Sequence, residues 1–82
     1  MDNYEITALL NRGIVEFNLG EDERIRWKDS GSYSYPVGMT SHYHDAYRTF
    51  EEVLRKDPNH SDARRLLEMA QQRLPYKMDS RL

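Results

Sequence analysis

The stretch from Tyr43 to Leu74 constrains the fold of this chain more than any other. Its apolar residues recur at steps of three and four, which places them on one face of a helix, and the pattern breaks once, at Asp57-Pro58-Asn59. Proline disfavours helical dihedral angles in the residue before it, so a first helix should end here, and Asn59 should cap the next one. Two amphipathic helices with so short a connection are expected to pack antiparallel. The two stripes consist of Tyr43, Ala46, Tyr47, Phe50, Val53 and Leu54, and then of Ala63, Leu66, Leu67, Ala70 and Leu74.

Within this stretch the chain resembles a known family. Ala46, Phe50, Val53 and Pro58 have the spacing of the second helix of a tetratricopeptide repeat (TPR), a helix-turn-helix unit of about 34 residues. Residues 59–74 are similar to the helix that closes such arrays. The resemblance implies an all-α fold, in which an antiparallel TPR-like helix pair is followed by a third, capping helix. It also implies a protein-binding role, as a scaffold or adaptor.

The segment from Asn3 to Gly20 has the apolar spacing of another helix and is similar to the first helix of a TPR, which a glycine such as Gly20 closes. Asp2 and Glu5 have the spacing of a capping box. Gly13 lies inside the apolar stripe, where glycine costs about 1 kcal/mol relative to alanine. We therefore expect Gly13 to let a neighbouring helix approach closely. The stripe consists of Ile6, Leu9, Leu10, Gly13, Ile14 and Phe17.

Residues 21–41 are the largest departure from the repeat, because a TPR joins its two helices by a short turn. The first part, Glu21 to Lys28, is rich in helix formers and allows the first helix to run on toward Trp27. The second part has the glycine, proline and serine content of a loop, which predicts a long loop between helices 1 and 2. Thr40 or Ser41 is then expected to cap the following helix. A loop this long in a small domain is usually functional or disordered.

Length and composition indicate one small domain. Residues 1–75 should form the domain and residues 76–82 a short tail, since Pro75 stops the third helix. The chain has no cysteine, no apolar run long enough to span a membrane and no secretory signal, so we expect a cytoplasmic protein. Its net charge of −2 argues against a nucleic-acid partner. Ser80-Arg81-Leu82 resembles the Ser-Lys-Leu peroxisomal address, which gives an alternative localisation.

The sequence offers no convincing catalytic or metal site. His42, His44 and Asp45 are ligand types that suit zinc, but residues two apart on a helix point in different directions. There is no nucleophile elbow and no phosphate-binding glycine loop, and the adjacent Glu51 and Glu52 face different ways on a helix. We therefore predict a protein that is not an enzyme and that has no cofactor and no metal.

Aromatic residues in or beside the inserted segment are candidate contacts with a partner protein, because aromatic side chains in a flexible loop make good interface anchors. Alternatively, Trp27 and one tyrosine fold back to cover the small core, and the sequence leaves both interpretations open. The candidates are Trp27, Tyr33, Tyr35 and Tyr43.

Two polar residues complete the candidate site. Arg64 belongs to a basic group with Arg55, Lys56 and Arg65 on both sides of the corner at Asp57-Pro58-Asn59, although such groups are ordinarily a solvated face. Asn11 is the one residue that matches the side chains with which a subgroup of TPR domains grips the C-termini of heat-shock chaperones. The lysines of that subgroup are missing, so we do not predict that clamp.

Together these features predict a non-catalytic protein–protein interaction module that binds a helix or extended segment of a partner. A single repeat leaves apolar faces open, so a second copy, including a domain-swapped one, is also an expected partner. The alternative is a small structural subunit or assembly factor that contacts a larger complex through the inserted loop.

Overall fold

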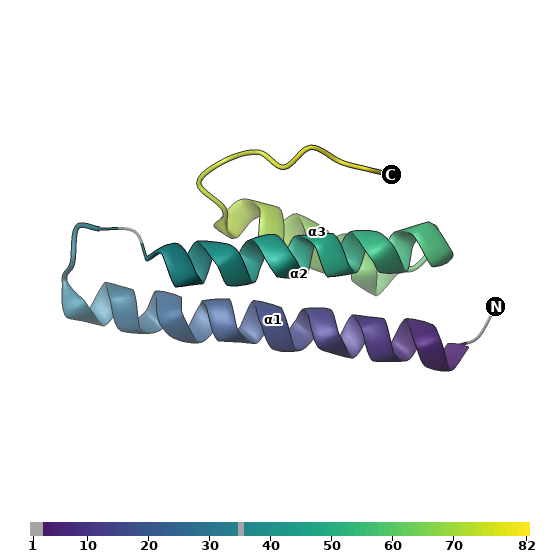
Figure 1. Ribbon diagram of the computed structural model, residues 1–82, viewed down its shortest axis with the longest axis horizontal. Coiled ribbons are helices and arrows are strands. Elements are labelled where there is room, and N and C mark those ends of the chain that lie inside the picture. The colour runs from purple at the N-terminus through teal and green to yellow at the C-terminus, as the bar shows by residue number, and fades with distance from the viewer. Residues whose placement is uncertain (1–2, 35) are drawn as a thin grey trace.

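Three helices form the fold in the computed structural model, which describes residues 3–34 and 36–82. They are α1 (Asn3–Ser30), α2 (Val37–Lys56) and α3 (Ser61–Arg73), and no strand occurs within the described ranges. This arrangement confirms the all-α prediction. α2 runs antiparallel along α1, and α3 packs against another side of α2 (Figure 1). The molecule is elongated, 46 × 23 × 16 Å, because α1 alone is 28 residues long.

The connection between α1 and α2 is shorter than the long loop predicted for the second part of the inserted segment, Asp29 to Thr40. α1 continues without a break through Gly20, and only residues 31–36 lie outside the two helices. Gly31 follows α1 with φ of +69°, in the left-handed region that glycine enters without a steric penalty. The helix formers of Glu21–Lys28 outweighed one interior glycine, whose cost is only about 1 kcal/mol.

Two helix caps also differ from the prediction. Pro36 takes the N-cap position of α2 in place of Thr40 or Ser41, because the helix begins earlier than expected. At α3 the cap is His60 and not Asn59. The His60 Nδ1 accepts a hydrogen bond of 3.1 Å from the backbone N–H three residues further on, as a capping side chain does.

α2 lies at the centre of the core. Its predicted apolar stripe is buried, with Tyr43 and Phe50 fully enclosed and Tyr47 nearly so. The predicted corner is confirmed as well, since α2 ends at Lys56, directly before Asp57-Pro58. The flanking helices each present one apolar stripe to α2. Their buried apolar members are Ile6 and Phe17 in α1, Ala63, Leu67 and Ala70 in α3, and Leu74 directly after α3.

Two glycines let α1 lie close to α2. A Cβ atom at Gly13 would lie 2.5 Å from the Phe50 ring, and one at Gly20 would lie 2.8 Å from the Tyr43 ring. Carbon atoms in proteins pack at about 3.5–4.0 Å, so the two rings occupy the space that side chains at these positions would need. Phe17 stands between the glycines, and its ring centroid is 5.5 Å from that of Tyr43. The role predicted for Gly13 is confirmed, and Gly20 has the same role within the helix instead of ending it.

The residues after α3 lie against the helices. We call residues 75–82 the tail. The tail turns back from the end of α3 and crosses over α2 and α3 in an extended conformation (Figure 1). Met78 is its one buried residue, with 6% of its surface exposed.

Candidate functional site

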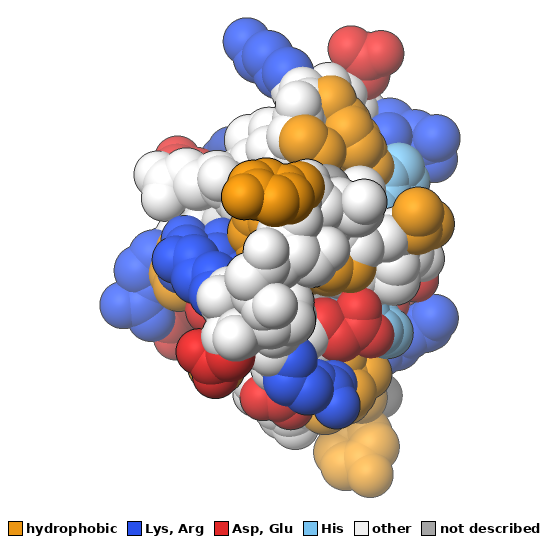
Figure 2. All heavy atoms as spheres, turned by 90° about the vertical axis from the view of Figure 1, so that its left-hand side faces the viewer, with side chains coloured by type: hydrophobic (Ala, Val, Ile, Leu, Met, Phe, Trp, Pro, Cys, Tyr) orange, Lys and Arg blue, Asp and Glu red, His pale blue; other side chains and the backbone are white. Residues whose placement is uncertain are grey.

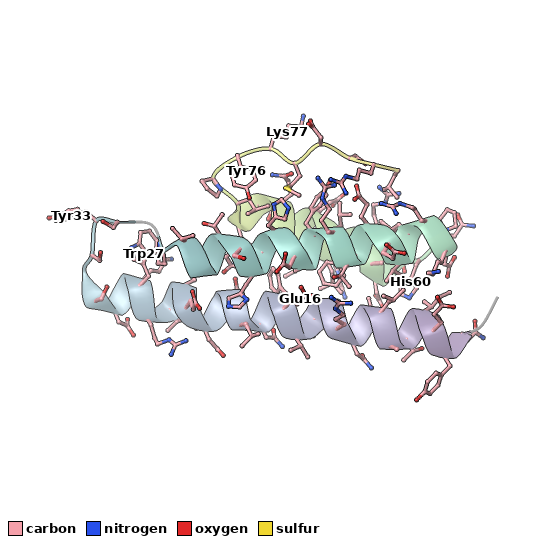
Figure 3. All side chains as sticks on the ribbon, in the orientation of Figure 1. Glu16, Trp27, Tyr33, His60, Tyr76 and Lys77 are labelled. Atoms are coloured by element: carbon pink, nitrogen blue, oxygen red, sulfur yellow. The ribbon has the colours of Figure 1, made fainter. Side chains whose placement is uncertain are left out.

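The tail lies across α2 and α3, and we call the surface of these helices that it covers the tail groove. It is defined by Tyr47, Arg48 and Glu51 from α2 and by Leu67 and Gln71 from α3. Figure 3 shows the tail, marked by Tyr76 and Lys77, above these two helices. A hollow of about 360 Å³ remains between α3 and the tail. Its lining includes Tyr47, Leu67, Gln71, Gln72 and Met78.

The Gln71 side chain holds two main-chain groups of the tail. Its Nε2 donates to the Tyr76 carbonyl at 2.8 Å, and its Oε1 accepts from the Met78 N–H at 2.8 Å. One carboxamide therefore satisfies a donor and an acceptor two residues apart on an extended chain. Neither bond depends on the side chains of the tail.

Two residues of α2 hold the next part of the tail in the same way. The Arg48 guanidinium donates to the Asp79 carbonyl at 3.0 Å, and the Arg81 N–H donates to Glu51 Oε2 at 2.5 Å. Both side chains also bond to each other, since Arg48 Nη1 lies 2.9 Å from Glu51 Oε1. The tail groove thus makes four hydrogen bonds to main-chain atoms between Tyr76 and Arg81.

Glu51 is the charged residue at the bottom of this contact, with no exposed surface. Burial acts to raise its pKa, but the hydrogen bonds from the Arg81 N–H and the Arg48 side chain, with the charges of Arg48 and Arg55, outweigh it. The net effect is a pKa below the usual value for a glutamate, so Glu51 is ionised near neutral pH. A buried carboxylate of this kind requires its partners, and one of them is the tail.

A second polar cluster joins all three helices at Glu21. Its Oε1 accepts hydrogen bonds of 2.7 Å from the Tyr43 hydroxyl and from Arg73 Nε. Burial acts to raise the pKa of Glu21, but these two bonds, together with the charges of Arg73 and Arg24, outweigh it and leave the pKa lowered. Burial, and then the bond to Glu21, raise the pKa of Tyr43. The cluster fixes how the helices pack, and we assign it a structural role.

The tip of the α1–α2 hairpin holds two of the predicted contact residues (Figure 3). Trp27 is half-buried and packs against the core, whereas the Tyr33 side chain is fully exposed. A hollow of about 400 Å³ lies beside Trp27, bordered by Arg26, Ser30 and Pro36 among others. Figure 2 looks onto this end, where hydrophobic side chains stand singly or in small groups among charged side chains of both signs.

The other predicted contact residues are scattered. Tyr43 has no exposed surface, so its interpretation as a partner anchor is wrong in this fold; its ring instead fills the space beside Gly20. Asn11 and Arg64 are exposed on α1 and α3, and neither lies at the hairpin tip. Tyr35 lies outside the described residues. Of the predicted contact residues that the structure describes, it therefore places Trp27 and Tyr33 alone at the hairpin tip.

Each histidine makes a contact within the chain. His42 Nε2 lies 3.3 Å from a Glu23 carboxylate oxygen, His44 Nδ1 lies 3.0 Å from the Tyr76 hydroxyl, and His60 caps α3. Among residues 3–34 and 36–82, no group of three or more histidine or acidic residues is arranged to hold a metal ion. Over the same residues, none of the helices is apolar for long enough to cross a bilayer.

Sequence reasoning missed the tail groove. Arg48, Glu51, Gln71 and Met78 were not among the predicted contacts, although one signal for Glu51 was present. Glu51 follows Tyr47 by four residues and precedes Leu54 by three, which places it on the buried face of α2.

The fold and the tail groove define an all-α protein of three helices with an extended segment held across two of them. Comparison of the chain with protein-family models, with curated proteins and with solved structures finds no match.

Proposed function

We propose that this chain is a non-catalytic protein-interaction module that binds an extended segment of a partner protein in the tail groove. The observation that supports the proposal is the set of four hydrogen bonds from Gln71, Arg48 and Glu51 to the main chain of the tail. Main-chain groups are the same in every peptide, so such bonds provide affinity for extended segments of many sequences. Met78 is buried in the same core cluster as Tyr47 and Leu67, and its site adds selectivity for an apolar side chain.

We also propose that the helices form a TPR-like unit with a capping helix. The close approach of Gly13 to Phe50 and the burial of Ala46 support this reading, because the family places small residues where its paired helices meet. The chain departs from the family in size. α1 and α2 together span residues 3–56, well beyond a repeat of about 34 residues.

A peptide array tests the proposed function. The chain of residues 1–82 with Met78→Ser, which weakens the binding of the tail to the groove, is incubated with an array of eight-residue peptides. The same variant is then compared with added Gln71→Ala or Gln72→Ala. Gln72 is the matched control, since it borders the same hollow but makes none of the four main-chain bonds.

We expect Gln71→Ala to weaken peptide binding about tenfold, because two hydrogen bonds of about 0.5–1.5 kcal/mol each are lost. Gln72→Ala should leave binding within about twofold. Equal binding by the Gln71→Ala and Gln72→Ala chains would show that the tail groove is not the peptide site.

The second candidate function is a structural subunit that contacts a larger complex through the hairpin tip. The observation in its favour is the exposure of apolar side chains there, with Tyr33 wholly exposed and Val37 83% exposed beside the Trp27 hollow. Size-exclusion chromatography with light scattering separates the two candidates. An isolated chain that aggregates, and that Tyr33→Ser returns to a monomer, favours the subunit. A monomer that melts cooperatively favours the free-standing module.

A further inference from the structure

The tail is bound as a separate peptide ligand would be. Its main chain supplies the four hydrogen bonds, and only Met78 is buried among its side chains. Tyr76 keeps 43% of its surface exposed, and Lys77 and Asp79 are exposed as well. The groove therefore binds the main chain of the tail and one buried apolar side chain, and the one further side-chain contact described above is that of the Tyr76 hydroxyl with His44 Nδ1.

The tail also has a large advantage over any separate segment. Leu74 is buried directly after α3, and the first tail carbonyl bound, that of Tyr76, belongs to a residue only five positions after Gln71. A segment tethered this closely has an effective concentration of about the millimolar range or above. A free peptide with the same contacts must compete with that concentration.

We propose that residues 76–81 are an autoinhibitory segment that occupies the tail groove in cis and that a partner segment of the same chemistry must displace. This inference rests on the proposed function of the groove. The displacing partner is an extended protein segment with an unbranched apolar side chain, of which methionine is the example in the structure.

The hydrogen bonds restrict that partner further. The partner residue that takes the place of Met78 must donate its N–H to Gln71, and the one that takes the place of Arg81 must donate its N–H to Glu51. Proline has no N–H, so it is excluded at both positions. Proline in the place of Arg81 should weaken binding strongly, because it would leave the fully buried Glu51 carboxylate without one of its hydrogen-bond donors.

The test measures binding of a labelled peptide with the sequence of residues 75–82. Three chains of residues 1–82 are compared by fluorescence anisotropy: wild type, Met78→Ser and Met78→Ser with Gln71→Ala. A fourth chain with a Gly-Ser-Gly-Ser insertion after Pro75 keeps Met78 but lowers the effective concentration of the tail, and circular dichroism checks that all four chains are helical. The control peptide carries Arg81→Pro.

We expect Met78→Ser and the insertion to tighten peptide binding at least about tenfold relative to wild type, since a groove that is 90% occupied leaves a tenth of the molecules available. Adding Gln71→Ala to the Met78→Ser chain should abolish this gain in affinity, and so should replacing the peptide by its Arg81→Pro variant. Equal binding by wild type and both released chains would overturn autoinhibition and leave the groove as a peptide site. If neither the Met78→Ser chain nor the insertion chain binds the peptide, the proposed function itself is overturned. A wild-type dimer in light scattering that Met78→Ser dissociates would also overturn the inference, since the tail would then dock onto a second copy.

Discussion

The packing of α1 on α2 makes a sharp prediction at Gly13. In an open helix, Gly13→Ala would stabilise the protein by about 1 kcal/mol, because alanine has the higher helix propensity. Here the added Cβ would lie 2.5 and 2.8 Å from two atoms of the Phe50 ring, which is fully buried. Overpacking of this kind costs about 1–3 kcal/mol. The steric cost therefore exceeds the gain, and we expect a net loss of about 1 kcal/mol.

Thermal unfolding followed by circular dichroism measures this loss, which for a domain of this size corresponds to a fall in Tm of about 4–8 °C. Asn18→Ala, at an exposed position of the same helix, is the control and should raise Tm slightly through propensity alone. In a Phe50→Leu background, which removes the ring, Gly13→Ala should cost less than in the wild type by about 1 kcal/mol. A rise in Tm for Gly13→Ala in the wild-type background would refute the close approach of the two helices.

Three further outcomes follow from the structure. The pKa of Glu51 is lower in the folded than in the unfolded chain, so the stabilisation from its ionised form is present above the ordinary glutamate pKa of about 4.3 and is lost as pH falls through the folded value. Glu51→Gln should therefore lower the free energy of unfolding by about 1–3 kcal/mol at pH 7 and make that free energy depend less on pH under acid conditions. Because the pKa of Tyr43 is raised above the ordinary tyrosine value of about 10, its stabilisation should be lost as pH rises above about 10, and an alkaline absorbance titration should show a late step that Tyr43→Phe removes. Tyr33→Ser should change the free energy of unfolding by less than about 0.5 kcal/mol in urea titrations, since its side chain is fully exposed.

The helical fold could be predicted because its signals are local. The stripe on α2 and the break at Asp57-Pro58 depend on residues within a few positions of one another, and both were found where expected. The close approach at Gly13 was also predictable, since a glycine that costs stability in an apolar stripe usually makes room for a neighbour. Its partner, Phe50, was not predictable, because it depends on the register between two helices.

The sequence left the end of α1 open, at Gly20 or toward Trp27, because Gly20 has two possible roles. Glycine ends many helices, and the same residue inside a helix accommodates a ring from a neighbouring helix. Only the position of Tyr43 decides between these roles, and that position is a tertiary contact 23 residues away along the chain. Once α1 continues past Gly20, the expected loop shrinks to the residues between Ser30 and Val37, so that Trp27 packs against the core and Tyr33 is exposed at the hairpin tip.

The tail groove could not be predicted from the sequence for a different reason. Its contacts are made to main-chain atoms, and main-chain atoms leave no pattern in a sequence. The sequence does contain one indirect signal. Glu51 lies on the buried face of α2, and a buried carboxylate is destabilising unless other groups supply hydrogen bonds and opposite charge. Arg48 and Arg55 are within one helical turn and satisfy part of that need, whereas the Arg81 N–H comes from 30 residues away. A charge on a buried stripe is therefore a signal that some distant segment must fold over it, and here that segment is the tail.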